Sequence, residues 1–119
     1  MRILIVDDNE QMRRTIRSLL SDLADETFEA CDGNGALEIC RACRPDWVLM
    51  DVRMEGLDGI RTTRLLKSAL PETNVIVMTS YDDPGVREAA VAAGASAFLQ
   101  KDNLLAVREV LSAEVRRTT

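Results

Sequence analysis

Five polar residues whose side chains could do chemistry share one kind of position in this sequence. Each directly follows a short, mainly apolar run: Asp7 and Asp8 follow residues 3–6, Asp51 follows 47–50, Thr79 follows 75–78, and Lys101 follows 97–100. If these runs are buried strands of an open parallel sheet, their carboxyl ends meet at one edge, where such sheets bind ligands. Three carboxylates, a hydroxyl and an ammonium group would then share one small site.

Carboxylates gathered in this way repel one another, so the site needs a cation to hold them together. Mg²⁺ suits this need, because it prefers near-octahedral oxygen coordination. Asp51 is the candidate nucleophile, since a carboxylate can accept a phosphoryl group covalently. Lys101 and Thr79 could neutralise and hydrogen-bond the phosphoryl oxygens, as phosphoryl transfer requires. Each residue also has an ordinary role open to it: a helix or turn cap for the aspartates, a snorkelling edge lysine, and a β-branched strand residue.

Strand-like and helical patterns alternate along the chain. We predict strands at five places: Arg2–Val6, Thr27–Cys31, Trp47–Met50, Asn74–Met78 and Ala97–Gln100. Each interval is long enough for one helix, and right-handed crossovers then give a flavodoxin-like (βα)5 fold of the α/β class, with a doubly wound five-stranded parallel sheet. In the order 2-1-3-4-5, the first and third strands are neighbours at the switch point, which would bring the three aspartates together.

Residues typical of helix ends mark the intervening helices. The first helix is predicted to be amphipathic, with apolar residues at helical spacing from Met12 to Leu23 and three arginines on the opposite face: Arg13, Arg14 and Arg17. We expect these boundary residues in the later helices: Asn34 as the cap of the second, Asp58-Gly59 at the start of the third, Pro84 in the first turn and Gly94 after the end of the fourth, and Arg116-Arg117 at the end of the fifth.

Length and composition limit what the chain can do. Its 119 residues suit one domain, 1–119, whose last residues could be a tail or the start of a linker to an absent output domain. A net charge of −5 argues against a nucleic-acid-binding surface in this segment. The N-terminal apolar run is short and no stretch reaches ~20 apolar residues, so we expect no signal peptide, no membrane span and a cytoplasmic location.

An odd number of cysteines and the absence of histidine argue against a zinc site or a disulfide framework. Cys40 and Cys43 fall within a helical pattern, where we expect a structural role.

This ordered set of residues resembles the response regulator receiver domain family over essentially the whole chain. The resemblance rests on these residues: Asp7-Asp8, Asp51 followed by Met54 and Asp58-Gly59, Thr79-Ser80, and Lys101. The Lys101-Asp102 ending is similar to the NarL/FixJ-type branch, whose members usually carry a C-terminal helix-turn-helix. Glu55 departs from the family pattern, which usually has proline there. Asp102 also stands where many members have proline, which leaves the cis or trans state of the Lys101–Asp102 peptide open.

The resemblance implies a role for each site residue. The ligands of Mg²⁺ would be Asp8 and Asp51 directly, Asp7 through water, and Arg53 through its carbonyl group. Asp51 would accept the phosphoryl group, assisted by Thr79 and Lys101. Thr79 and Phe98 would form a switch, in which the aromatic ring turns inward when the threonine moves to the phosphate. Arg53 and Tyr81 would flank the mouth of the site and control the entry of water.

The function implied by the resemblance is that of a phosphoacceptor in two-component signal transduction. A histidine kinase or histidine phosphotransfer protein would supply the phosphoryl group, since this chain contains no histidine. The chain would hydrolyse its aspartyl phosphate slowly, which is not the behaviour of a conventional enzyme. The state of Asp51 would reach the face formed by the fourth helix, the fifth strand and the fifth helix, where a homodimer could form on phosphorylation. The expected output is transcription, with DNA contacted only through a separate domain.

Three other interpretations stay open at this point. A phosphatase with an aspartate nucleophile needs a second acid two residues after the nucleophile, where Arg53 stands. A flavodoxin-like cofactor binder should have a loop rich in Ser, Thr or Gly after the first strand, whereas residues 7–10 are Asp-Asp-Asn-Glu. Glu55 and Asp102 keep open a phosphorylation-independent interaction module of the same fold.

Overall fold

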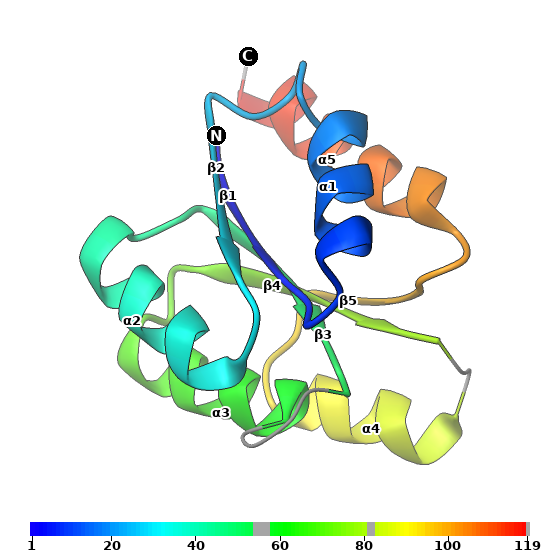
Figure 1. Ribbon diagram of the computed structural model, residues 1–119. Helices are drawn as coiled ribbons and strands as arrows, with labels where there is room; N and C mark the ends of the chain where they lie inside the picture. The colour runs from blue at the N-terminus through cyan, green and yellow to red at the C-terminus, as the bar shows by residue number, and fades with distance from the viewer. Residues whose placement is uncertain (54–57, 81–82, 119) are drawn as a thin grey trace.

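Strands and helices alternate along the chain in the computed structural model, which describes residues 1–53, 58–80 and 83–118, with side chains up to residue 114 (Figure 1). The strands are β1 (Arg2–Val6), β2 (Glu26–Ala30), β3 (Trp47–Asp51), β4 (Asn74–Thr79) and β5 (Ala97–Gln100). The helices are α1 (Glu10–Leu19), α2 (Gly33–Cys43), α3 (Gly59–Ala69), α4 (Pro84–Ala92) and α5 (Leu104–Thr118). The predicted strands lie within one residue of the observed bounds. Cys31, placed in the second strand by its sequence pattern, lies just after β2 and is exposed.

The strands form one parallel sheet in the order β2-β1-β3-β4-β5, which confirms the predicted topology. In the register of the two central pairs, Val6 lies beside Met50, and Asp51 lies beside Met78. The residues that follow β1 and end β3 and β4 therefore meet at one edge of the sheet. β1 and β3 are buried along almost their whole length, which explains why both strands are continuous apolar runs rather than alternating patterns.

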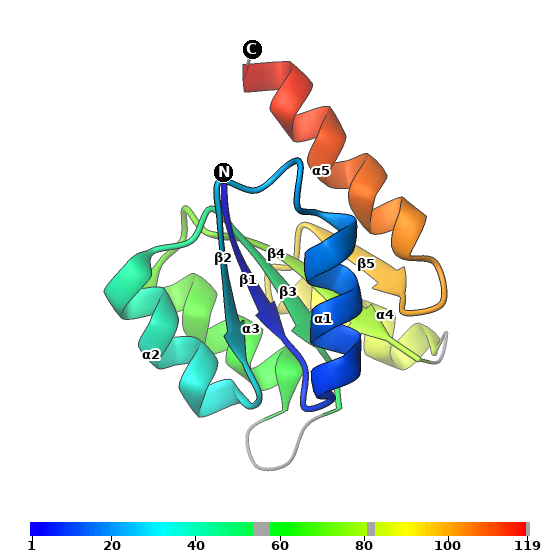
Figure 2. The same cartoon turned by 45° about the horizontal axis from the view of Figure 1, so that its top comes forward.

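Helices cover both faces of the sheet: α1 and α5 lie on one face, and α2, α3 and α4 lie on the other (Figures 1 and 2). Successive strand residues point to opposite faces, so β1 contributes Ile3 and Ile5 to the α1–α5 side and Leu4 and Val6 to the other. Each helix packs buried residues on these layers: Ile16 and Leu20 from the α1 segment, Ala36 and Cys40 from α2, Leu66 from α3, Ala90 from α4, and Val107 and Leu111 from α5. Burying a large aliphatic side chain contributes about 1.5–3 kcal/mol, so these two layers hold the sheet rigid beneath the site.

Capping side chains fix where the helices begin. Asp32, and not Asn34 as predicted, caps α2, because its carboxylate accepts the Gly35 N–H at 2.7 Å while Asn34 lies inside the first turn. Asp58 caps α3 as expected, by accepting the Arg61 N–H at 2.8 Å. Both expectations for α4 are also confirmed. Pro84 is its first residue, and Gly94 follows its C-cap with a φ of 101°.

Three further observations bear on the sequence predictions. Cys40 is buried in α2, and burial raises the pKa of its thiol to about 11, which is the behaviour of a structural cysteine. The peptide bonds of the described segments, including that between Lys101 and Asp102, are trans. Among the described helices, none is long and apolar enough to cross a membrane.

Candidate functional site

The three predicted carboxylates meet at the carboxyl edge of the sheet. Asp7 and Asp8 follow β1, Asp51 ends β3, and one carboxylate oxygen from each lies within 4.8 Å of the others. Asp7 and Asp51 are buried, whereas Asp8 is exposed at the rim. Three oxygens at this separation, one of them open to solvent, suit a hard cation that keeps part of its water shell. The donor set thus fits Mg²⁺.

Lys101 joins two of these carboxylates. Its Nζ lies 2.7 Å from Asp7 Oδ2 and 3.0 Å from Asp51 Oδ2, and its side chain is largely buried. The main-chain N–H of Lys101 donates to the Thr79 carbonyl at 2.7 Å, so β4 anchors the start of the loop that presents the ammonium group. With all groups ionised, the three aspartates and one lysine carry a net charge of −2, which one divalent cation would balance.

Burial and the nearby charges oppose each other at Asp51. Burial and the neighbouring Asp7 raise the pKa of the Asp51 carboxyl, and the hydrogen bond and charge of Lys101 lower it, with a net upward shift. Burial lowers the pKa of Lys101, but its contacts with Asp7 and Asp51 outweigh that effect, and the net shift is again upward. Lys101 therefore stays charged in the site, and ionised Asp51 is left in need of further positive charge.

The backbone after β3 is held against the start of α3. The Val52 N–H donates to the Met78 carbonyl, and the Gly59 N–H donates to the Val52 carbonyl, each at 3.0 Å. A Cβ atom at position 59 would lie 1.9 Å from the Asp51 carbonyl oxygen, so only glycine permits this approach. The sequence signal for Gly59 was its place in a family motif and at a helix start, and the structure adds the steric reason.

Thr79 and Phe98, the predicted switch residues, lie on neighbouring strands. Thr79 ends β4 and is buried, one residue beyond the partner of Asp51 in the sheet register. Phe98 is half-buried on β5 and packs on the side of the sheet covered by α2, α3 and α4, to which Thr79 also points by strand alternation. The Arg87 guanidinium of α4 lies 4.9 Å from the centre of the Phe98 ring.

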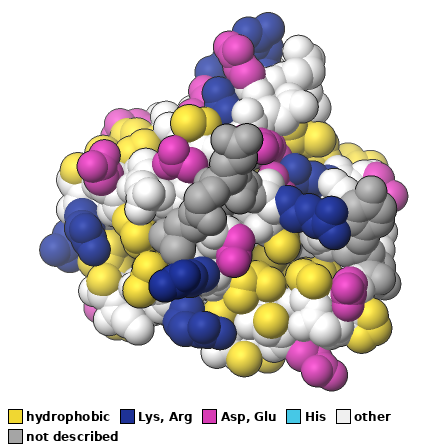
Figure 3. Space-filling model, turned by 60° about the horizontal axis from the view of Figure 1, so that its bottom comes forward, with side chains coloured by type: hydrophobic (Ala, Val, Ile, Leu, Met, Phe, Trp, Pro, Cys, Tyr) yellow, Lys and Arg dark blue, Asp and Glu magenta, His cyan; other side chains and the backbone are white. Residues whose placement is uncertain are grey.

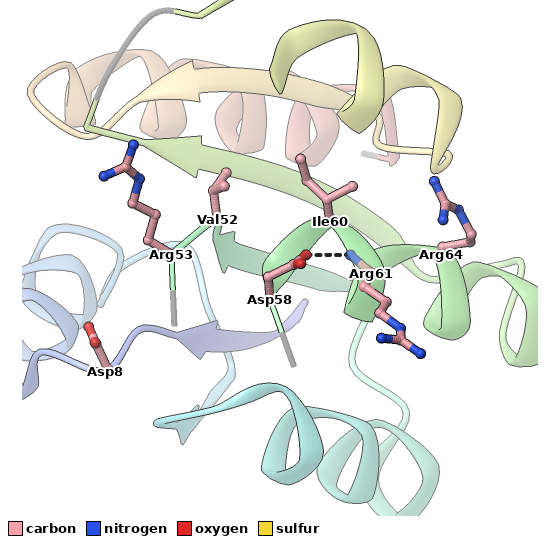
Figure 4. A pocket seen from close by; sticks show the side chains of 7 residues that line it. All are labelled: Asp8, Val52, Arg53, Asp58, Ile60, Arg61 and Arg64. Carbon is pink, nitrogen blue, oxygen red and sulfur yellow. Dashed lines mark hydrogen bonds between the residues drawn. The ribbon is translucent and has the colours of Figure 1, made fainter. Parts of the chain in front are cut away.

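A hollow beside the acidic cluster is lined by residues of three segments: Asp8, Val52, Arg53, Asp58, Ile60, Arg61 and Arg64 (Figure 4). The Arg53 N–H lies 3.4 Å from Asp51 Oδ1, while its exposed side chain extends away from Asp8 toward the end of β4 (Figure 4). Basic and acidic side chains both lie at the surface on this end of the molecule in the space-filling view (Figure 3). Met54, Glu55 and Tyr81, singled out in the sequence, lie outside the described residues.

Arg13, which we expected on the outer face of the first helix, contacts the backbone of the site. Arg13 Nη1 donates to the Asp7 carbonyl at 2.6 Å, and Arg13 Nε donates to Glu29 of β2 at 3.1 Å. No spacing rule predicts these two contacts, because the distances from α1 to the end of β1 and to β2 depend on how the helix packs on the sheet.

A parallel five-stranded sheet with acidic residues and a lysine at its carboxyl edge is the arrangement of a receiver domain. The family model described as the response regulator receiver domain matches residues 3–112, so the chain belongs to this family. Response regulator MprA of Mycolicibacterium vanbaalenii is 38% identical over 121 residues, which cover 99% of this chain and 52% of that protein.

Two further comparisons agree with this assignment. YhcZ, an uncharacterized transcriptional regulatory protein of Bacillus subtilis, is 35% identical over 125 residues, covering 100% of this chain and 58% of YhcZ. The solved receiver domain of NarL from Mycobacterium tuberculosis has a TM-score of 0.81 and 32% identity, covering 93% of this chain and 95% of that chain. The chain thus spans a little over half the length of these two curated relatives.

Proposed function

We propose that this receiver domain accepts a phosphoryl group from a phosphohistidine onto Asp51. The observation that carries the proposal is the position of the Lys101 ammonium, which Asp7 holds 3.0 Å from the Asp51 carboxylate. A fixed positive charge beside the acceptor is what phosphoryl transfer needs, because its catalysis is mainly positioning and neutralisation of oxygen charge.

In the proposed transfer, a carboxylate oxygen of Asp51 attacks the phosphorus of the donor. The O–P bond forms as the P–N bond breaks, and the donor imidazole keeps the electron pair and takes a proton from solvent. In the slow hydrolysis that follows, water attacks the phosphorus and the O–P bond to Asp51 breaks. Inorganic phosphate then leaves, and the carboxylate is restored.

Asp8 and Asp51 would hold Mg²⁺ directly, with Asp7 acting through water and Arg53 through its carbonyl group. The bound ion would supply the two positive charges that the cluster lacks. This chain's own contribution is to gather the three carboxylates within 4.8 Å and to keep Asp8 open to solvent at the rim.

The signal would pass from Asp51 through Thr79 and Phe98 to the surface formed by α4, β5 and α5. The partner that donates the phosphoryl group would be a histidine kinase or a histidine phosphotransfer protein. Because YhcZ is named a transcriptional regulatory protein and the chain spans 58% of it, we infer that the output is transcription through a further domain. The similarity to the NarL receiver supports placing the chain in the NarL/FixJ-type branch. A homodimer would form on phosphorylation.

Intact-mass measurement tests the acceptor. Acetyl phosphate or a phosphohistidine donor with Mg²⁺ should add one phosphoryl group to the wild-type protein and none to Asp51→Asn. Asp46→Asn is the matched control, because Asp46 precedes the same strand at the opposite edge of the sheet and should leave phosphorylation unchanged. Undiminished phosphorylation of Asp51→Asn would refute the assignment and favour an interaction module that works without phosphate.

A further inference from the structure

Asp7 has a protein partner at each of its polar atoms. Its N–H donates to the Ala30 carbonyl at 3.1 Å, and its own carbonyl accepts from Arg13 at 2.6 Å. Its Oδ1 accepts the Asn9 N–H at 2.9 Å, and its Oδ2 lies 2.7 Å from Lys101 Nζ. Three of these partners are backbone groups or the site lysine. Arg13 is the side chain that comes from outside the acidic cluster.

A second arginine braces Arg13 through a shared carboxylate. Arg13 Nε donates to Glu29 Oε1 at 3.1 Å, and Arg17, one turn further along α1, donates to Glu29 Oε2 at 2.6 Å. The Arg13 side chain is only 16% exposed, so solvent screens its own contacts little, whereas Arg17 is 48% exposed. A planar guanidinium with two such partners has few other orientations, because its donors form a rigid fork.

The contact of Arg13 with the Asp7 carbonyl affects how the peptide between Asp7 and Asp8 is oriented. It belongs to the peptide group that links Asp7 to Asp8, and a planar peptide turns as one unit. Fixing its oxygen therefore fixes the plane from which the Asp8 side chain departs, while the Asp7 side chain is held by Asn9 and Lys101. The guanidinium thus limits how far the backbone that carries Asp8 can turn relative to the Asp7 carboxylate.

We propose that Arg13, braced by Glu29, is a positioning residue that orients Asp7 and Asp8 for binding a divalent cation. The inference rests on the proposed function, because it assumes that these carboxylates hold Mg²⁺. Groups behind the direct ligands of a metal commonly change its affinity by 10–100-fold when removed. We expect Arg13 to act in that way although it touches no ligand oxygen.

The adjacent residue offers a matched control. Arg14 lies on the same helix, but it is exposed and pairs only weakly with Glu10, at 3.4 Å one turn before it. Arg13→Gln and Arg14→Gln remove the same charge from the same helix, so the long-range field at the site changes similarly in both. Only Arg13→Gln removes the contact with the Asp7 carbonyl.

The test is an Mg²⁺ titration followed by amide NMR at constant ionic strength, together with hydrogen exchange of the Asn9 amide in the metal-free proteins. Arg13→Gln should weaken Mg²⁺ binding about tenfold and speed exchange at Asn9. Arg14→Gln should stay within about twofold of wild type, since it leaves every contact behind the ligands in place. Glu29→Gln weakens the contact that holds Arg13 but keeps the guanidinium, so it should also weaken Mg²⁺ binding, by less than Arg13→Gln does. It serves as the second variant if Arg13→Gln folds poorly.

The outcomes separate the inference from the proposed function. Wild-type affinity in both Arg13→Gln and Glu29→Gln, or equal weakening by Arg14→Gln, would overturn the positioning role while leaving the metal site intact. A wild-type protein that bound no Mg²⁺ would overturn the proposed function, and the inference with it. A lower melting temperature without any change in Mg²⁺ affinity would show that Arg13 serves stability alone.

Discussion

Asp51 faces conflicting requirements at the scale of the single residue. As the proposed nucleophile it must be ionised, yet it is buried and one of its carboxylate oxygens lies within 4.8 Å of oxygens of two other carboxylates. Lys101 offsets part of the free-energy cost of ionising Asp51. The pKa of Asp51 is still raised above its ordinary value of 3.8, with burial as the largest cause. A raised pKa in the folded state means that the folded protein binds more protons than the unfolded chain over that range. Asp51 therefore stabilises the fold most below pH 3.8 and less as the pH rises through its folded pKa.

The upward shift of the Asp51 pKa predicts how the stability of Asp51→Asn depends on pH. Without divalent cations, the melting temperature of Asp51→Asn relative to wild type should rise as the pH is increased from 4 upward, because the variant avoids an unfavourable buried charge. Adding Mg²⁺ at about 100 times its Kd should stabilise wild type by about 2.7 kcal/mol and the variant much less. Thermal unfolding across this pH range, with EDTA or Mg²⁺, checks both effects. Equal Mg²⁺ increments in the two proteins would contradict the role of Asp51 as a ligand.

Gly59 packs directly against the backbone of Asp51, so a side chain at position 59 would disturb both the fold and the site. An added methyl group would meet the Asp51 carbonyl oxygen at 1.9 Å, which backbone movement alone can relieve. We predict that Gly59→Ala lowers the free energy of unfolding by about 3 kcal/mol, the upper range for overpacking, and displaces the Asp51 loop. Gly85→Ala is the control, since its Cβ would meet only the movable Asp83 carboxylate, at 3.3 Å. Denaturant unfolding of both variants measures the difference, and a Gly59→Ala protein as stable as wild type would contradict the close approach.

At the scale of elements, α4 contacts β5 through a side chain that packs on Phe98, the proposed switch residue. The Arg87 guanidinium lies 4.9 Å from the centre of the Phe98 ring, and α4 contributes a narrow buried surface in which Ala90 is the buried helix residue. A cation over an aromatic face stabilises an exposed contact by about 0.5–1 kcal/mol. This contact favours the observed position of the ring, so it should oppose the movement of Phe98 in the proposed switch.

Arg87→Gln should therefore make the proposed movement of the Phe98 ring more favourable. Removing the Arg87–Phe98 contact loses about 0.5–1 kcal/mol of stabilisation of the observed ring position. If beryllofluoride, a phosphoryl mimic, binds better when the Phe98 ring has moved inward, its apparent affinity should rise roughly two- to fivefold. NMR titration gives the affinity, and the Phe98 ring resonances report its position. Glu88→Gln, at the next position on α4 and exposed, should change neither quantity. Weaker beryllofluoride binding by Arg87→Gln would contradict a restraining role.

At the scale of the whole molecule, the sheet connects the acidic cluster to a distant surface. β4 pairs with β3, which ends in Asp51, and with β5, which carries Phe98 and leads to Lys101. Adjacent strands therefore join Asp51, Thr79 and the α4–β5–α5 surface. Coupling between two such sites needs a difference in contacts between two states and is typically ~1–3 kcal/mol. The packed layers on both faces favour discrete rearrangements over gradual deformation.

The corresponding prediction separates acceptance of the phosphoryl group from its transmission. Beryllofluoride with Mg²⁺ should shift amide resonances of α4, β5 and α5 in the wild-type protein. In Thr79→Ala, resonances around Asp51 should still shift, while the distant shifts become smaller because the hydroxyl no longer draws β4 toward the mimic. Full distant shifts in Thr79→Ala would refute the role of the hydroxyl, and no distant shifts in wild type would favour an interaction module that does not depend on phosphorylation.

The amino-acid sequence alone was sufficient to predict the sheet order and the cluster of Asp7, Asp8, Asp51 and Lys101. The reason is general: buried parallel strands are readable as apolar runs, and their carboxyl ends must lie at one edge of the sheet. The positions just after the runs therefore converge, whatever the details of the helices. Helix caps were less predictable, as the choice of Asp32 over Asn34 shows, because two good capping residues two positions apart differ only in local backbone geometry.

The tertiary structure decided the features that depend on how closely two packed elements approach each other. It placed Arg13 of α1 on the Asp7 carbonyl and on Glu29 of β2, although helical periodicity assigns that arginine to an outer face. It also brought Gly59 against the Asp51 backbone and Arg87 over Phe98. Periodicity gives the face of an element on which a side chain lies. Only the packing of one element on another decides what that side chain reaches.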